Sequence, residues 1–375
     1  MSLRNYHKYS LIMAEFIKGL DLCRGFFHEA AEPILERHFP ELRYSAGLIG
    51  YGSDVLGYDD PVSRDHMWGP RFYCFLDPSD IGRKEEVFDA FSRELPYEYK
   101  GYSVNFTVPD PNDNGVQHPE FITSGRVNPL IFIQTFDEFL EEQLGTSALD
   151  SLTAADWLTF SEHRLLSLTA GEWFRDGLNL SKRLDAIRFY PEDVRRYRIA
   201  ANWDIIASEQ AFVRRCADVG DDLGSVIVAA RIAERLMRLC FLYKKQYAPY
   251  SKWFGTAFAH PKLDVPQELK DALYGALHAG SIAERENALV RAQALTAALH
   301  NESGITAPVE YEVESYYGRE IKVIFANKFA EAVLETLEGT ALAEVPLIDT
   351  FSALGGISNV SDDLRYSPLI RTLYE

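Results

Sequence analysis

The spacing of apolar residues changes near residue 150, and this change constrains the fold more than any other feature of the sequence. Before it, short strand-like and longer helix-like stretches alternate. The predicted strands are 43–53, 71–77 and 99–108, and the predicted helices are 8–38, 82–95 and 133–145. After it, strand signals fade, and apolar residues recur every three or four positions. The helices predicted there are 155–168, 190–220, 223–247, 266–280, 281–301 and 316–339.

We therefore expect an α+β fold class: a mixed sheet with flanking helices over residues 1–150, followed by an all-helical domain over residues 151–375. A chain of 375 residues is long enough for two such domains.

The formal net charge of -18 limits the possible partners. An acidic chain repels the phosphate backbone of nucleic acids unless Lys and Arg gather locally. Bulk DNA or RNA binding is therefore disfavoured, whereas a nucleotide or a small acceptor molecule is compatible with this charge. A protein partner also remains open.

The four cysteines, at positions 23, 74, 216 and 240, form no CxxC pair and stand in apolar surroundings. They predict buried free thiols and a cytoplasmic protein. No apolar run reaches about 18 residues, so we expect no membrane span. The N-terminus lacks the apolar stretch of a signal peptide.

A small-residue turn, Gly52-Ser53, ends the first predicted strand, and Asp65 precedes the second. Glycine allows close approach of a triphosphate, and Ser53 can add a hydroxyl contact. A carboxylate at Asp65 could hold Mg²⁺ against the phosphates. Arg71, at the start of the second strand, is a further candidate for a phosphate contact. Two carboxylates two positions apart on a strand would share one face, but the second position holds Met67.

The plainer interpretation is a common Gly-Ser turn and an aspartate that caps a strand. Taken alone, these residues favour that interpretation. The sequence contains no GxxxxGK[ST] loop, complete GxGxxG, HExxH or GxSxG motif.

Two segments, 47–72 and 214–258, resemble the bacterial proteins of the domain of unknown function 4037 family, within the nucleotidyltransferase superfamily. The resemblance extends over nearly the whole chain. It implies a nucleotidyltransferase-type α/β domain followed by a helical domain, similar to aminoglycoside nucleotidyltransferases. It also implies that Gly52 and Ser53 contact phosphate and that Asp65 binds metal.

The resemblance also shows what is missing from the metal site. Met67 stands where the superfamily usually has an acid, and a third carboxylate is normally carried by a later strand. Residues 102–108 contain no acid, and Asn105 is one of the side chains expected to point inward there. A thioether cannot replace an oxygen anion as a ligand for Mg²⁺, so we expect a weak or absent metal site.

Residues 244–258, KKQYAPYSKWFGTAF, predict an aromatic-rich loop with an embedded lysine. Tyr250 and Trp253 could stack on a base, and Lys252 could neutralise a phosphate. The alternative is a helix end whose aromatic residues fill an interface between the domains. The resemblance favours the binding interpretation.

Three arginines, Arg231, Arg235 and Arg238, share one helix face and need acidic partners if they are buried. Asp218, Asp221 and Asp222 are the partners we expect. By the resemblance, Asp218 or Asp221 could act as a general base on an acceptor hydroxyl. The alternative, a helix cap with ion pairs, is the stronger interpretation.

Three functions follow. The first is transfer of a nucleoside monophosphate from a nucleoside triphosphate to a small hydroxylated acceptor, in a cleft between the domains. The second is a catalytically inactive nucleotide-binding or regulatory protein, and the third is a protein-interaction module. Met67 favours the second over the first.

Overall fold

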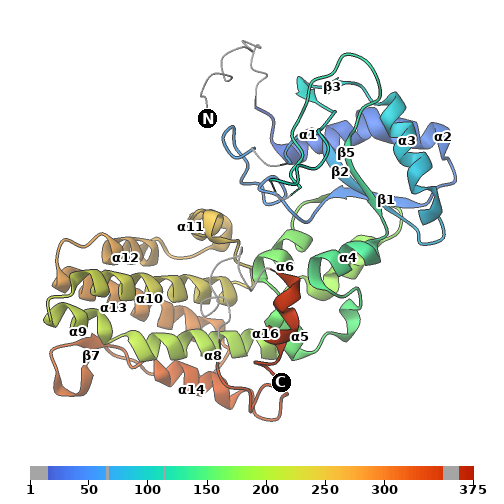
Figure 1. Ribbon diagram of the computed structural model, residues 1–375. Coiled ribbons are helices and arrows are strands. Elements are labelled where there is room, and N and C mark those ends of the chain that lie inside the picture. Colours follow the sequence, from blue (N-terminus) through green and yellow to red (C-terminus); the bar gives the residue numbers. More distant parts are fainter. Residues whose placement is uncertain (1–15, 65–66, 114, 349–362) are drawn as a thin grey trace. The chain divides into compact units, whose positions relative to one another are not determined.

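The computed structural model describes residues 16–64, 67–113, 115–348 and 363–375. The chain forms two compact units (Figure 1). The first consists of residues up to 149 together with 167–188, and the second of 150–166 and 189–375. The division expected at residue 150 therefore differs from the observed one over 167–188, because that stretch returns to the first unit.

The first unit is built on a four-stranded mixed sheet with the strand order β5-β2-β1-β6. Strand β2 pairs antiparallel with β1 and parallel with β5, and β6 pairs antiparallel with β1. The strands are β1 (Tyr44–Leu48), β2 (Arg71–Leu76), β5 (Leu130–Gln134) and β6 (Glu172–Asp176). The expected class, a mixed sheet with flanking helices followed by a largely helical part, is confirmed.

Successive residues of β2 point to opposite faces of this sheet, and helices cover both faces. Phe72 contacts Phe27 and Phe91, with ring centroids 5.3 and 6.0 Å away. On the other face, Phe75 contacts Phe136 at 5.2 Å. The helices of this unit are α1 (Gly19–Phe26), α2 (Glu32–His38), α3 (Lys84–Glu94), α4 (Phe136–Leu144) and α7 (Leu180–Leu184), with a π-helical turn (Phe27–Ala31) between α1 and α2.

The third strand of the sheet lies elsewhere than predicted. The range 99–108 contains the last residue of β3 (Glu98–Tyr99) and all of β4 (Tyr102–Ser103), which pair with each other as a small separate hairpin. The third strand is β5, and the helix predicted over 133–145 overlaps its last two residues. Thr135 ends this strand region and caps α4 through a capping box with Glu138, and Gly145 terminates that helix in the left-handed conformation.

The second unit is a helical bundle around α10, which packs against α8, α9, α12 and α13. The helices are α5 (Ala154–Thr159), α8 (Glu192–Glu209), α9 (Phe212–Asp218), α10 (Asp222–Tyr243), α11 (Ser251–Ala259), α12 (Gln267–Leu277), α13 (Ile282–Ser303), α14 (Asn327–Glu335) and α16 (Ser367–Arg371). Helix α6 (Glu162–Thr169) begins in this unit and ends in the first. The helix predicted over 316–339 is wrong in its first half, where β7 (Glu314–Ser315) pairs with β8 (Lys322–Val323).

A chain of hydrogen bonds runs through the core of the bundle. Trp203 Nε1 donates to the Tyr243 hydroxyl at 2.7 Å, and that hydroxyl lies 3.0 Å from His300 Nδ1. His300 Nε2 lies 2.9 Å from Thr306 Oγ1. The His300 ring is fully buried, and burial lowers its pKa to about 4.

Within the described ranges, no helix combines the length and apolarity needed to cross a lipid bilayer. All four cysteines are free thiols. Burial raises the pKa of Cys23, Cys74 and Cys240 to about 12, so these three are not activated nucleophiles.

Candidate functional site

The Gly52-Ser53 turn lies at the edge of the sheet where β1 ends and β2 begins. The antiparallel register, with Gly47 opposite Tyr73, brings these two strand ends together. Arg71 Nη2 donates a hydrogen bond to the Tyr51 carbonyl at 2.9 Å. The turn is therefore in contact with the first residue of β2. Asp65, the predicted metal ligand, lies outside the described residues.

Arg71 forms a buried ion pair with Asp54 in this turn. Its Nη2 lies 2.8 Å from Asp54 Oδ1 and 3.0 Å from Oδ2, and both side chains are almost completely buried. Burial alone lowers the pKa of Arg71, but the Asp54 carboxylate raises it above its usual range. In the structure the guanidinium of Arg71 holds the turn through Tyr51 and Asp54, and a phosphate contact by this residue stays a prediction.

This ion pair leaves no room for a side chain at position 52, so the position requires glycine. The φ of Gly52 is +138°, and an added Cβ would lie 2.1 Å from Asp54 Oδ1 and 2.4 Å from Arg71 Nη2. No side chain fits in that space. The glycine that the sequence suggests for phosphate therefore has a structural reason of its own.

The other buried acid of this loop also has a structural role. Asp59 Oδ2 accepts hydrogen bonds from Gly19 N at 2.7 Å and from Trp68 Nε1 at 3.0 Å, and Lys18 forms an ion pair with Oδ1 at 3.5 Å. These contacts tie the loop to the start of α1. Met67 is described, and it adopts a left-handed φ of 47°, which is uncommon for a residue other than glycine.

No third carboxylate completes a metal site in the described part of the chain. Asn105, expected to point inward, accepts a hydrogen bond from Asn128 N at 2.8 Å and donates to the Glu120 carbonyl at 3.2 Å, which fixes a loop. Strand β5, LIFIQ, contains no acid. Among described residues, no three His, Cys, Asp or Glu side chains are grouped so as to hold a metal ion. Magnesium binding at Asp65 stays a prediction.

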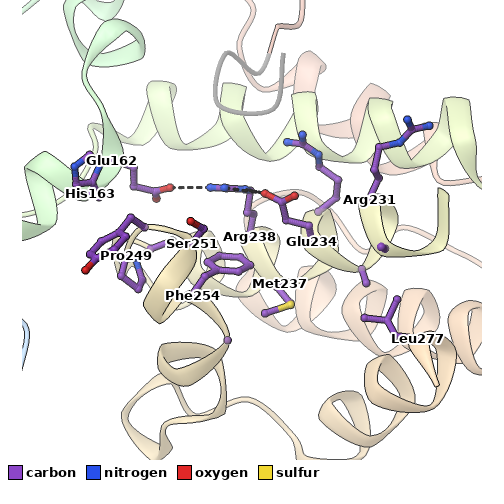
Figure 2. A pocket seen from close by; sticks show the side chains of 16 residues that line it. Glu162, His163, Arg231, Glu234, Met237, Arg238, Pro249, Ser251, Phe254 and Leu277 are labelled. Carbon is purple, nitrogen blue, oxygen red and sulfur yellow. Dashed lines mark hydrogen bonds and ion pairs between the residues drawn. The ribbon is translucent and has the colours of Figure 1, made fainter. Parts of the chain in front are cut away.

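A pocket of about 520 Å³ lies wholly within the helical unit (Figure 2). One wall is the middle of α10, and another is the chain that leads into α11. Its lining residues are Glu162, His163, Ala230, Arg231, Ala233, Glu234, Arg235, Met237, Arg238, Ala248, Pro249, Tyr250, Ser251, Phe254, Gly255 and Leu277. Arg235 and Tyr250, both predicted to bind a nucleotide, therefore line one cavity.

Arg238 joins the polar groups of the pocket. Its Nη1 lies 3.3 Å from Glu162 Oε2, its Nη2 lies 2.9 Å from Glu234 Oε1, and Figure 2 shows the arginine between these two carboxylates. The guanidinium also lies 5.1 Å from the centre of the Phe254 ring. Arg238 thus connects α10 with α6 and with α11.

The predicted acidic partners of the arginines are wrong. Arg235 is buried and lies near Asn202, with Nη1 3.4 Å from Oδ1, and Arg231 pairs with Glu209, with Nε 3.1 Å from Oε2. An acid at the start of α10 cannot reach them, since the rise of 1.5 Å per residue separates Asp222 from Arg235 by about 20 Å.

The two acids before α10 have local partners, whereas Asp222, its first residue, pairs with Arg285 of α13 at 2.7 Å. Asp218 accepts a hydrogen bond from Arg214 Nε at 2.6 Å, and Asp221 caps α10 by accepting from Gly224 N at 2.8 Å. Neither residue lines the pocket. Their predicted catalytic role therefore gains no support from their positions, whereas helix capping explains Asp221 directly.

The segment around residues 250–254 is helical where a loop was predicted, because α11 begins at Ser251. Lys252 and Trp253 are not among the residues that line the pocket. They lie against each other instead, with Lys252 Nζ 4.9 Å from the centre of the Trp253 ring.

The sequence interpretation missed Glu162, His163, Glu234 and Phe254 as pocket residues. Glu234 and Arg238 are four positions apart on one helix face, a spacing that could have indicated their ion pair. No comparable signal links α6 to α10.

Residues 157–254 match the model of the family described as domain of unknown function DUF4037. No protein with a curated description matches the chain. A crystal structure of a nucleotidyltransferase-like protein from Exiguobacterium sibiricum is 12% identical, with a TM-score of 0.32, over 80% of this chain and 98% of that one.

The family match covers less of the chain than the sequence resemblance suggested, because it leaves out the Gly52-Ser53 turn. It includes every residue that lines the pocket except Gly255 and Leu277. The family that the chain matches, over residues 157–254, is the domain of unknown function DUF4037.

Proposed function

We propose that this protein binds a nucleotide in the pocket of its helical unit, and that it is a nucleotidyltransferase-like protein whose transfer activity is weak or lost. The observation that carries the proposal is the pocket itself. It joins Arg235 and Tyr250, which the sequence indicates for phosphate and base contacts, with Arg231 and Phe254.

The size and chemistry of the pocket support this ligand class. A volume of about 520 Å³ lies in the range of small-molecule sites. The charged side chains of its lining are three arginines and two glutamates, one more positive than negative charge, although Arg231 also pairs with Glu209 outside the lining; the chain as a whole has a net charge of -18. A local positive excess in an acidic protein favours an anionic ligand. Tyr250 and Phe254 supply aromatic surface for a base.

Met67 is the reason for proposing binding without efficient transfer. Mg²⁺ prefers oxygen ligands, and a neutral thioether cannot supply the missing negative charge. Nucleotide binding in the helical unit should therefore not depend on Mg²⁺.

A second candidate function is transfer of a nucleoside monophosphate to a small hydroxylated acceptor, with Mg²⁺ at Asp65. The contact between Arg71, six positions after Asp65, and the Tyr51 carbonyl just before the Gly52-Ser53 turn supports it. This function requires release of pyrophosphate that depends on Mg²⁺.

Thermal unfolding with ATP, GTP, CTP and UTP, each with and without Mg²⁺, tests the proposal. At a ligand concentration 100 times the Kd, binding stabilises the folded state by about 2.7 kcal/mol. We expect at least one nucleotide to raise the Tm without metal. Stabilisation that requires Mg²⁺, together with pyrophosphate release, would support the second candidate instead.

Two variants locate the binding site. Arg231→Met removes a cation from the pocket and should reduce the nucleotide-dependent rise in Tm. Arg215→Met is the matched control, because Arg215 is an exposed arginine of the same unit outside the pocket. Equal loss in both variants would refute the site. No shift with any nucleotide would refute the proposal and favour a protein-interaction module.

A further inference from the structure

The segment from Lys245 to Asp264 carries α11, and contacts between residues near its two ends hold those ends together. We call this pair of ends the base of the segment. Lys244 Nζ lies 3.0 Å from Asp264 Oδ2, and Gln246 Nε2 donates to the Lys262 carbonyl at 2.9 Å. Lys245 and Asp264 both adopt left-handed backbone conformations, with φ of 50° and 52°. Such conformations are uncommon outside glycine and mark sharp changes in chain direction. The segment therefore leaves and rejoins the bundle at one place.

The base of this segment is anchored in the core. Tyr247 is buried, with its ring centroid 5.0 Å from that of Phe189 and 4.9 Å from that of Tyr190. Phe258, near the end of α11, and Leu263 are buried as well.

The tip of the segment, residues 249–256, is held much less firmly. Residues 250–256 are exposed or only partly buried. The contacts that hold the tip include Phe254 with Arg238 and with Phe241, whose ring centroid is 5.6 Å away, and Tyr250 with His163 at 6.1 Å. Regions with few buried apolar contacts open at a lower free energy than the core.

This tip forms one side of the pocket, through Pro249, Tyr250, Ser251, Phe254 and Gly255. The facing side belongs to α10, the central helix of the bundle. The two sides of the cavity therefore differ in stability, and the weaker one can separate while α10 stays folded.

We propose that residues 249–256 are a lid over the pocket, which opens about the anchored base and is held shut by the packing of Phe254 against Arg238. Ligand control of the lid rests on the proposed nucleotide binding. Opening of the lid in the ligand-free protein is independent of that proposal.

Hydrogen exchange of the full chain without ligand tests the lid. We expect the amides of 250–256 to exchange faster than those of α10, and Phe254→Leu to accelerate them about tenfold without changing α10. Phe212→Leu is the matched control, since Phe212 lies under Arg215 at 5.3 Å, outside the pocket. It should leave the tip unchanged. A tip protected as well as α10 would overturn the lid, as would equal acceleration of both regions by Phe254→Leu.

A second arm adds ATP or GTP to the wild-type protein and compares the tip with α12. Slower exchange confined to 249–256 supports closure by the nucleotide. If a nucleotide raises the Tm but leaves tip exchange unchanged, ligand control of the lid is refuted while the binding proposal stands. If no nucleotide raises the Tm, the proposed function fails, and the exchange of the free protein still decides whether the lid exists.

Discussion

Gly52 is the position where a single added methyl group has the clearest consequence. We expect Gly52→Ala to lower the free energy of unfolding by roughly 3–5 kcal/mol, because the Cβ would push apart the buried Asp54–Arg71 pair. Urea unfolding monitored by circular dichroism measures this loss.

Gly57→Ala is the control for this change. Gly57 also has a positive φ, of 74°, but an added Cβ would meet no atom within 4 Å. Its cost should be only that of the left-handed backbone, about 1–2 kcal/mol. Equal losses at positions 52 and 57 would show that the ion pair does not require the glycine.

His300 should make the stability of the protein depend on pH. Above pH 6.5 its ring is neutral in both the folded and the unfolded chain. As pH falls from about 6.5 to 4, the unfolded chain binds a proton that the folded chain excludes. Stability should then fall by roughly 3 kcal/mol, with little further loss from this group at lower pH.

The difference between the wild type and His300→Phe isolates this contribution. Unfolding free energies measured between pH 4 and 7 should show a shallower slope for the variant. Parallel curves would mean that His300 does not titrate differently in the two states.

Some residues of the candidate site could be predicted from the sequence, and others could not. Arg235 and Tyr250 could be selected from the sequence, since their residue types and neighbours suggest anion and ring contacts. The partners of Arg71 could not, because its ion pair with Asp54 depends on how β1 and β2 align. Local sequence carries no record of that contact between strands.

For helix α10, substitutions of Asp221 distinguish a helix cap from a general base. Asp221→Ala should lower stability by about 1 kcal/mol, and Asp221→Ser should restore most of it, because serine also caps helices. Thermal unfolding measures the effect. If transfer activity is found, and alanine and serine abolish it equally while serine restores stability, Asp221 is more than a cap.

The elements that the sequence predicts best are those with a long, regular pattern. Helices α3, α10, α12 and α13 lie within a few residues of their predicted bounds. The two missed strands of the main sheet, β5 and β6, are both edge strands. Only Phe174 is buried in β6, so its pattern is faint. Only Gln134 and Thr135 separate the apolar run of β5 from the first apolar residue of α4, which hides the change from strand to helix.

For the whole chain, the return of residues 167–188 to the first unit determines which fragments fold. A fragment of residues 1–150 lacks β6 and leaves the β1 edge unpaired. We expect this fragment to aggregate or to unfold without a cooperative transition. Residues 1–188 contain all four strands and should melt cooperatively. Circular dichroism melts with light scattering compare the two, and a cooperative melt of 1–150 at the same temperature would refute this account.

The same return of the chain has a consequence for synthesis on the ribosome. The positions that pair in β1 and β6, Leu48 and Glu172, are separated by 124 residues of sequence. At translation rates of about 5–20 residues per second, β1 waits roughly 6–25 s for its partner. The N-terminal sheet therefore cannot be completed before part of the helical unit has emerged. We expect the exposed edge of β1 in the nascent chain to be open to wrong pairing during that interval. An mRNA truncated between the codons for Leu48 and Glu172 encodes a product in which this edge stays unpaired.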